Sequence, residues 1–368
     1  MKELKYMGKK GTIILVTILI IVISVAIGIL YYKETSKKIT NNEIFDNKNI
    51  EEIVDEPLII QKEEKKVQIF NGDDRPIAVM LDNHTGAWPH GGLNQAYLVY
   101  EIIVEGSETR LMALFKGVDV EKIGSVRSSR HYFLDYALEN DAIYVHYGWS
   151  PQAEGDISRY RVNNINGISE SSTSFWRTKD KSSPHNVATS TEKIKEIAQR
   201  KKYSITSKKE SVLNYVTDDV TLENGILADT VTIPHSSAQK VEYKYNEETG
   251  RYTRYARNKL QKDWNTGEEI TTKNIIITFC DNYTLQDSEN KGRQGLTNIG
   301  TFDGYYITNG KAIQIKCTKS SRTEQTVYND LEGNEIKVND GNTFIHICPK
   351  KANVKIEGTE EAIITENQ

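Results

Sequence analysis

Residues 96–118 have the sequence AYLVYEIIVEGSETRLMALFKGV, in which two apolar runs flank a short polar segment. Val, Ile, Leu, Tyr and Phe dominate the two runs, 96–105 and 110–118, and β-branched and aromatic residues favour strands. The polar segment begins with Gly106, and glycine is common where a hairpin turns. The stretch therefore predicts two antiparallel strands joined by a loop over residues 106–109.

The segments on either side of this hairpin alternate between predicted strands and predicted helices. Residues 76–82, PIAVMLD, form an apolar run that ends in a carboxylate, and residues 141–147, DAIYVHY, form another. Such runs are typical of buried strands. Apolar spacing over residues 133–138 and the capping-box pattern of Thr189-Ser-Thr-Glu192 predict two helices. Residues 70–215 are therefore predicted to form a mixed α/β domain of the α+β class.

After residue 225 the sequence changes to short strand-like runs, several of them rich in tyrosine, that are separated by Gly, Asn and Asp. Alternation of this kind favours antiparallel strands over helices. The runs are residues 230–233, 240–245, 252–256, 274–279, 304–308 and 343–347. Residues 225–352 are therefore predicted to form a mainly antiparallel β domain, and residues 353–368 a C-terminal tail.

Three cysteines, Cys280, Cys317 and Cys348, lie in or beside these runs. Their odd number and scattered spacing do not fit a complete set of disulfides or a zinc site. Buried free thiols are the favoured interpretation. A disulfide between two of the three, formed outside the cell, is the alternative.

Residues 11–30, GTIILVTILIIVISVAIGIL, contain no charged residue and are about as long as a helix that crosses a hydrocarbon core. We expect a cytoplasmic N-terminus over residues 1–10, a transmembrane anchor over 11–32 and a disordered stalk over 33–69. This arrangement predicts a single-pass protein of the cell membrane whose bulk is extracytoplasmic. A cleaved signal peptide is the alternative. Because no cysteine precedes Cys280, no N-terminal lipid is expected.

The composition limits the classes of partner. The 368 residues carry 47 Lys and Arg against 51 Asp and Glu, a formal net charge of −4, so the chain has no overall basic field for nucleic acid. A hydrophobic content of 38% excludes a polytopic membrane protein. The sequence contains no GxSxG, HExxH or glycine-rich nucleotide motif and no spacing diagnostic of a metal site. We therefore expect no cofactor, no metal and no nucleic acid.

Polar side chains collect where the strands of the first predicted domain end. Asp82 and Asn83 follow one strand, and His146 follows another. Arg127 and Arg130 precede a predicted helix, where guanidinium groups and backbone N–H groups can bind an anion together. The alternative is that these arginines pair with carboxylates of the same domain.

Several stretches, taken in order, resemble the YerB-like family. The stretches that resemble its N-terminal domain include RPIAVMLDNH (75–84), IGSVRSSR (123–130), VHYGWSP (145–151) and SPHNVATS (183–190). The stretches that resemble its C-terminal domain include GRYTRY (250–255) and EIKVNDGNTFIHICP (335–349). The resemblance implies a two-domain extracytoplasmic envelope protein of Gram-positive type. The family carries the domain of unknown function 3048 and has no established biochemical activity.

The resemblance also implies which polar residues belong to a shared site. The positions that match the family's characteristic polar residues are Asp82, Asn83, Glu101, Glu105, Arg110, Arg127, Ser128, Arg130, His146, Arg177, His185 and Asn186. All of these except Glu101 form the predicted ligand-binding set. Asp82, Glu105, His146 and His185 are the candidates for acid–base catalysis.

Three functional hypotheses follow. The first is a membrane-anchored binding or scaffold protein whose pocket of Arg, His and carboxylate side chains takes an anionic component of the cell envelope. The second is a hydrolase or transferase on an envelope polymer, with a histidine as base and a carboxylate as orienter or acid. The third is an adaptor that contacts another protein through the tyrosine-rich β domain. Because no nucleophile motif is present, we favour the first hypothesis over the enzyme.

Overall fold

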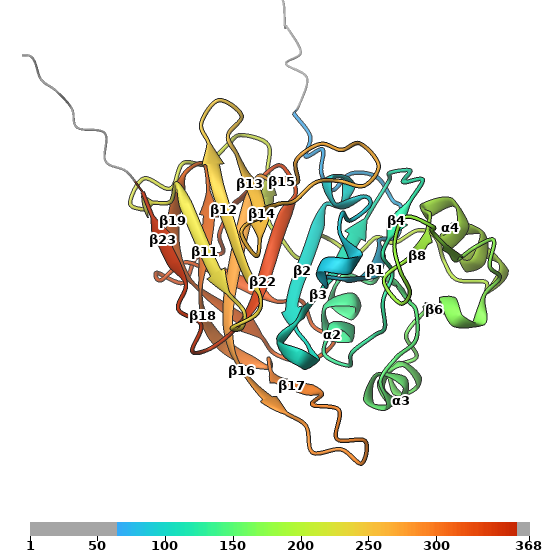
Figure 1. The fold of residues 1–368 in the computed structure, drawn as a ribbon. Coiled ribbons are helices and arrows are strands. Elements are labelled where there is room, and N and C mark those ends of the chain that lie inside the picture. Colours follow the sequence, from blue (N-terminus) through green and yellow to red (C-terminus); the bar gives the residue numbers. More distant parts are fainter. Residues whose placement is uncertain (1–64, 359–368) are drawn as a thin grey trace, which may run out of the picture. The chain divides into compact units, whose positions relative to one another are not determined.

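The computed structural model describes residues 65–358, which are built around a 12-stranded sheet (Figure 1). The predicted cytoplasmic N-terminus, the predicted anchor and most of the predicted stalk lie outside these residues. Among the helices of residues 65–358, none is both long enough and apolar enough to span a membrane.

The α-helices of the described residues all lie in the N-terminal half. The strands here are β1 (Ile77–Asp82), β2 (Leu98–Ile103), β3 (Thr109–Phe115), β4 (Ile123–Gly124), β5 (Ile143–His146), β6 (Asn164–Asn166), β7 (Trp176–Arg177), β8 (Val187–Thr189) and β9 (Tyr215–Val216). The helices are α2 (Phe133–Glu139), α3 (Pro151–Arg159) and α4 (Thr191–Arg200), with short 3₁₀ helices η1 (Thr85–Ala87), η2 (Leu93–Gln95), η3 (Glu105–Ser107) and η4 (Gly167–Ser169).

The C-terminal half of the described residues consists of strands and turns. The strands are β10 (Ile226–Leu227), β11 (Thr230–Pro234), β12 (Lys240–Asn246), β13 (Arg251–Ala256), β14 (Lys259–Leu260), β15 (Thr271–Thr272), β16 (Asn274–Thr284), β17 (Gln294–Thr297), β18 (Gly300–Thr308), β19 (Lys311–Lys319), β20 (Val327–Asn329), β21 (Val338–Asn339), β22 (Thr343–Pro349) and β23 (Lys355–Glu357). Each of the six predicted runs lies in one of these strands, as the sequence predicts.

One large sheet runs through both halves in the order β10-β19-β18-β16-β22-β2-β3-β1-β5-β6, with β17 on β16 and β20 on β19. β2 and β3 form the predicted antiparallel hairpin, and β3 also pairs antiparallel with β1. β22 lies between β2 and β16 and pairs parallel with both. These parallel pairs depart from the expected antiparallel pattern and join the two predicted domains into one sheet. The predicted domain boundaries themselves stay a prediction.

Both faces of the large sheet are covered. On β1, Ile77, Val79 and Leu81 pack into one apolar cluster, and Ala78 and Met80 pack into the other. A strand buried on both faces needs apolar residues at every position, which explains the unbroken run before Asp82. A second sheet, β14-β13-β12-β11-β23 with β15 on β13, covers the first cluster, and α2 packs on the second (Figure 1).

Local predictions differ from the structure by a few residues. Helix α4 is confirmed, but its N-cap is Ser190, whose side chain accepts the Lys193 N–H, whereas Thr189 donates to the Ser174 carbonyl. β23 lies inside the predicted tail and pairs with β11. The backbone N–H groups of Gln68 and Ile69, at the end of the predicted stalk, donate to the Asp340 carboxylate.

A buried ion pair joins the large sheet to the second sheet. Nη2 of Arg254 on β13 lies 2.7 Å from Oε2 of Glu101 on β2, and both side chains are 0% exposed. The other oxygen, Oε1, accepts hydrogen bonds from Asn83 and Thr109. Burial opposes ionisation of Glu101, but the Arg254 charge outweighs it and lowers the pKa of Glu101 to about 2. Two charges buried this deeply are tolerated because they face each other.

Replacing Arg254 is expected to destabilise the protein strongly. Arg254→Met leaves the Glu101 carboxylate buried without its cation, which costs about 3–5 kcal/mol. Urea unfolding at pH 7 measures this loss. The matched control is Lys316→Met, which removes a cation from the exposed Lys316–Asp303 pair and should cost less than about 1 kcal/mol. Equal losses in the two variants would contradict this account.

Candidate functional site

Six of the eleven predicted ligand-binding residues converge at one edge of the large sheet. β1 and β2 are both antiparallel to β3, so their carboxyl ends lie at the edge where β3 begins. In the β1–β3 register Asp82 lies opposite Arg110. A cavity of about 330 Å³ opens here, which we call the anion cavity. It is lined by Asp82, His84, Val104, Glu105, Glu108, Thr109, Arg110, Arg127, Arg130, His185 and Lys291.

Asp82, the last residue of β1, contacts the side chains of His185 and Arg127. Its Oδ2 accepts a hydrogen bond from Nδ1 of His185 at 2.7 Å, and Nε of Arg127 lies 3.2 Å from the same oxygen. Burial favours the neutral carboxyl, but the Arg127 charge and the His185 hydrogen bond outweigh it and keep the pKa of Asp82 below its ordinary value. Asp82 is therefore a carboxylate at neutral pH.

Backbone pairing fixes these side chains. The segment after β4 runs beside β1: the Arg127 N–H donates to the Met80 carbonyl, and the Asp82 N–H donates to the Ser125 carbonyl, both at 2.9 Å. The Ser125 hydroxyl donates to the His185 carbonyl. The positions of Arg127 and His185 relative to Asp82 therefore follow from main-chain geometry.

The His185 ring stacks on His84, with ring centroids 4.4 Å apart and planes 12° apart. Gly86 packs against both rings, and a Cβ there would come within 3.0 Å of His185 Cδ2. The Gly86 N–H also donates to Nδ1 of His84. A side chain at residue 86 would therefore require the stacked rings to shift by a few tenths of an ångström.

A second ion pair lies across the anion cavity. Nε of Arg130 donates to Oε1 of Glu105 at 2.6 Å, and Nη1 of Arg130 donates to the Ser129 carbonyl. Burial again opposes ionisation, but the Arg130 charge and its hydrogen bond keep the pKa of Glu105 below its ordinary value. Arg127 and Arg130 thus each pair with a carboxylate of the same half of the chain, as the alternative sequence interpretation expects.

Arg110 differs from its two neighbours. It is 7% exposed, and Nη1 donates to the Ser128 carbonyl at 2.6 Å. Among residues 65–358, no carboxylate oxygen lies within 4 Å of the Arg110 guanidinium nitrogens, the distance limit for an ion pair. Burial, together with repulsion from Arg130, lowers the pKa of Arg110 to about 10, so it stays a cation at neutral pH. A buried cation without a direct counter-charge attracts anions strongly.

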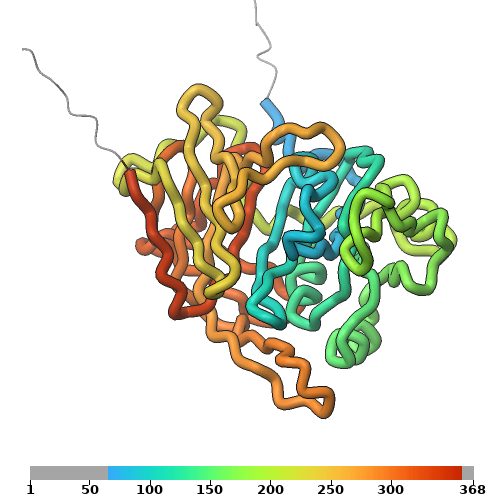
Figure 2. Tube along the Cα trace, viewed as in Figure 1, coloured from blue at the N-terminus to red at the C-terminus, as the bar shows by residue number. Residues whose placement is uncertain are grey.

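Some residues of the anion cavity escaped the sequence analysis. Lys291 belongs to the turn between β16 and β17, a hairpin that extends from the rest of the C-terminal half (Figures 1 and 2). β16 is parallel to β22, and β22 to β2, so the carboxyl end of β16 reaches the same edge as that of β2. No local pattern could reveal this pairing. Glu108 was also missed, and it pairs with Arg257.

Five predicted site residues do not line the anion cavity. They are Asn83, Ser128, His146, Arg177 and Asn186. The His146 ring is buried, with Nδ1 2.8 Å from the Gly148 carbonyl and Nε2 3.3 Å from Oδ1 of Asn164. Burial lowers the pKa of His146 to about 4. His146 therefore lies outside the lining of the anion cavity, and its candidate catalytic role stays a prediction.

The other four hold loops in place. Asn83 bonds to Glu101 and Thr109, beneath the anion cavity. The Ser128 hydroxyl donates to the Tyr147 carbonyl. Arg177 donates to Oδ1 of Asn186, and Nδ2 of Asn186 donates to the Thr178 carbonyl. The family resemblance implies these four residues, but the direction of each side chain is decided by tertiary packing.

One cluster in residues 65–358 brings a carboxylate and two imidazoles close enough to suggest a metal. Ligand atoms of Glu101, His235 and His346 lie within 4.8 Å of one another. However, Arg254 already donates to Glu101, and Nε2 of His235 lies 3.0 Å from Nδ1 of His346 in a hydrogen bond. A guanidinium beside the carboxylate would repel a metal cation, so these residues do not fit one. The three cysteines are buried free thiols.

Comparison with known proteins identifies both halves of the chain. Residues 63–204 match the domain described as Protein of unknown function (DUF3048) N-terminal domain, and residues 231–345 match its C-terminal domain. YerB, a lipoprotein candidate of Bacillus subtilis (strain 168), is 30% identical over 296 residues, which are 80% of this chain and 86% of YerB. The crystal structure of YerB protein from Bacillus subtilis matches with a TM-score of 0.69 at 28% identity, covering 77% of this chain and 94% of that one.

The ionisation of Asp82 should depend on Arg127. Carbon-13 NMR of the labelled Asp82 carboxyl is expected to give a midpoint below 3.8 in the wild type, and Arg127→Met should raise it by removing the charge that lies 3.2 Å away. Arg177→Met, which removes a guanidinium outside the anion cavity, should leave the midpoint unchanged. A wild-type midpoint at or above 3.8 would refute the described ion pair.

Proposed function

This chain belongs to the DUF3048 family of proteins of unknown function, and from the geometry of its own residues we propose that it is a membrane-attached extracytoplasmic protein that binds an anionic group of an envelope molecule. The observation that carries the proposal is Arg110, a buried guanidinium that lines the anion cavity and has no ion-pair partner within 4 Å among the described residues. Arg127 and Arg130 line the same cavity, and among the described residues Arg127 pairs with Asp82 and Arg130 with Glu105.

The charges of the anion cavity favour a phosphate or carboxylate ligand. Four cationic side chains and three carboxylates line it, and one of those carboxylates, Glu108, is already neutralised by Arg257. Guanidinium groups bind phosphate and carboxylate oxygens in pairs of parallel hydrogen bonds. A volume of about 330 Å³ is at the lower end of small-molecule sites. The cavity therefore suits one anionic unit of a larger molecule better than a whole polymer segment.

Attachment to the membrane is supported by the sequence of the N-terminal residues and by the similarity to YerB. Residues 11–30 are uncharged and long enough to cross a bilayer, and the lipoprotein candidate YerB is a relative of this chain. Because this chain has no cysteine before Cys280, we propose a peptide anchor over residues 11–32 in place of a lipid, with the folded residues outside the cell.

Arg110→Met is expected to weaken anion binding at least tenfold. A hydrogen bond to a charged group contributes about 1.5–3 kcal/mol, and the variant removes a side chain that can make two. Isothermal titration of the purified full-length protein measures this with phosphate-bearing cell-wall fragments, and with neutral glycan fragments for comparison. Arg177→Met is the matched control. Tight binding of the neutral fragments, or equal affinity in Arg110→Met and the wild type, would contradict the proposal.

A second candidate function is acid–base catalysis by His185. Nδ1 of His185 faces the Asp82 carboxylate, which leaves Nε2 as the ring nitrogen that can accept a proton. Both residues line the anion cavity, where the arginines could hold the anionic group of a substrate. The arrangement supplies a base and its orienter, and a hydrolase or transferase on an envelope polymer is the activity that we propose as the alternative.

Asp82→Asn separates the two functions. It removes a negative charge that faces the arginines, so binding alone predicts unchanged or tighter binding of the phosphate-bearing fragments. Catalysis predicts that Asp82→Asn and His185→Gln each abolish the release of new end groups from the polymer, because the base loses its orienter or is absent. Release that persists in His185→Gln would rule out this dyad as the catalyst.

A further inference from the structure

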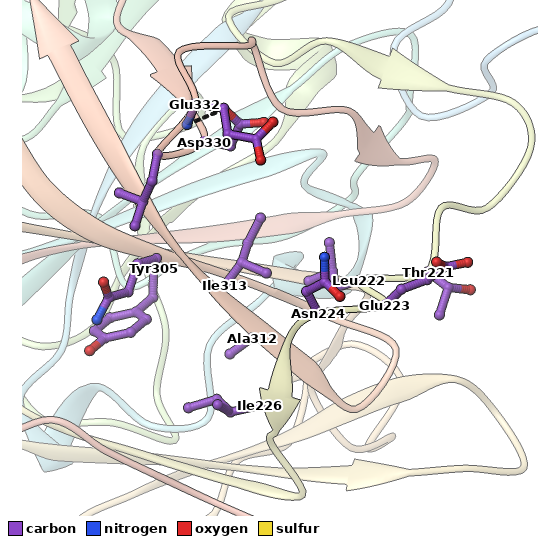
Figure 3. A pocket seen from close by; sticks show the side chains of 12 residues that line it. Thr221, Leu222, Glu223, Asn224, Ile226, Tyr305, Ala312, Ile313, Asp330 and Glu332 are labelled. Atoms are coloured by element: carbon purple, nitrogen blue, oxygen red, sulfur yellow. Dashed lines mark hydrogen bonds between the residues drawn. The ribbon is translucent and has the colours of Figure 1, made fainter.

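A second cavity lies along the outer edge of the large sheet, and we call it the edge cavity. Its volume is about 650 Å³. It lies between the segment that leads into β10, the strand β19 and the turn after β20 (Figure 3). None of its lining residues lines the anion cavity. The two cavities are therefore separate potential binding sites.

Strand β19 is only partly covered along this edge. β10 pairs with Lys311 and Ala312, and β20 pairs with residues 316–318. In the part of the chain that the structure describes, no strand pairs with the outer side of residues 313–315. Unpaired groups on an edge strand are a template for an added strand.

The unpaired backbone groups belong to Gln314. Asn309 and Gly310 have φ of 48° and 72°, the values of a type I′ turn, so Thr308 and Lys311 form its hydrogen-bonded closing pair. From this pair, alternate residues of β19 direct their backbone groups toward β18. Residues 313 and 315 therefore bond to β18, and the N–H and C=O of Gln314 point out into the edge cavity.

The lining of the edge cavity combines apolar and acidic side chains. Ile226 and Leu331 are 56% and 62% exposed, and Ile313 lies between them on β19. The acidic residues Glu223 and Glu332 lie on different sides of the edge cavity (Figure 3). No lysine or arginine belongs to the lining. A complementary ligand therefore carries positive charge beside an apolar group.

We infer that the edge cavity binds an extended cationic segment of a partner protein. The segment adds to β19 by exchanging backbone hydrogen bonds with Gln314. The gap between Ala312 and Lys316 is about 13 Å at a rise of about 3.3 Å per residue, which accommodates about three extended residues. An apolar side chain of the segment contacts Ile226 and Leu331, and its lysine or arginine side chains face Glu223 and Glu332.

The chain's own C-terminal residues are a poorer occupant. They start close to the edge cavity, because Gly358 packs against Leu227 of β10. Residues 359–368 contain Glu360, Glu361 and Glu366 and no lysine or arginine. Their negative charge would face the carboxylates of the lining, so charge complementarity favours a cationic partner.

The test uses the purified full-length protein and a fluorescein-labelled peptide, acetyl-Lys-Lys-Val-Lys-Lys-amide. Fluorescence anisotropy should show saturable binding that weakens as salt is added, because exposed charges are screened. The acidic peptide acetyl-Glu-Glu-Val-Glu-Glu-amide should bind at least tenfold more weakly. The cationic peptide with an N-methylated central valine should also lose at least tenfold, because it cannot pair with the Gln314 carbonyl. Equal affinities for the three peptides would overturn the proposal.

Two variants locate the site. Glu223→Gln combined with Glu332→Gln should weaken binding of the cationic peptide at least tenfold, whereas Glu247→Gln with Glu248→Gln, the same charge change on an exposed turn, should not. Gln314→Pro removes the outward N–H and should also weaken binding, since proline is tolerated where an edge strand's N–H faces outward. Circular dichroism confirms folding, and Leu331→Ser replaces Gln314→Pro if that variant unfolds. Wild-type affinity in the folded variants would refute the assignment.

Two further outcomes would assign the edge cavity to other occupants and overturn the proposal. The first is peptide binding that appears only after truncation behind Gly358, which would identify residues 359–368 as the occupant. The second is a dimer in sedimentation experiments that Gln314→Pro dissociates, which would identify a second copy of the chain.

Discussion

The buried ion pair between Glu101 and Arg254 is the interaction on which the rest of the structure depends. It joins residues 153 positions apart and lies where the second sheet packs on the large sheet. Neither charge reaches solvent, so each is stable in the core only while the other faces it. The same carboxylate holds Asn83, the residue directly after Asp82. Correct packing of the C-terminal half therefore positions the tip of β1 and, with it, the anion cavity.

The anion cavity follows from the direction of the strands. Parallel orientation of β1, β2, β22 and β16 brings their carboxyl ends to one edge, as is common for ligand sites in sheets with parallel strands. Carboxylates pair with two of the three arginines there, whereas among the described residues no carboxylate oxygen lies within ion-pair distance of Arg110. Burial makes this imbalance matter, because a charge interacts more strongly where water is excluded. The proposed anion binding rests on that imbalance.

The two cavities could act independently. In the order of the large sheet, β18, β16 and β22 separate β19 from β2, which corresponds to about 20 Å at the usual strand spacing. The anion cavity has a cationic surplus, and the edge cavity has only acidic charges. A protein with both sites would bring an anionic envelope group and a cationic protein segment onto one sheet.

The sequence by itself determined the local elements. The hairpin of β2 and β3, the strand that ends at Asp82, helix α4 and the tyrosine-rich strands could all be predicted, because period and turn residues act over a few positions. The sequence marks Asp82 at a strand end and Arg127 and Arg130 before a helix, and the family resemblance adds His185, but their convergence needs the tertiary structure. Only the tertiary structure decided that β22 pairs with β2, that Lys291 reaches the anion cavity and that His146 does not. These outcomes depend on contacts between segments that are far apart in the sequence. Such contacts are decided by packing of the whole fold, which no local sequence pattern encodes.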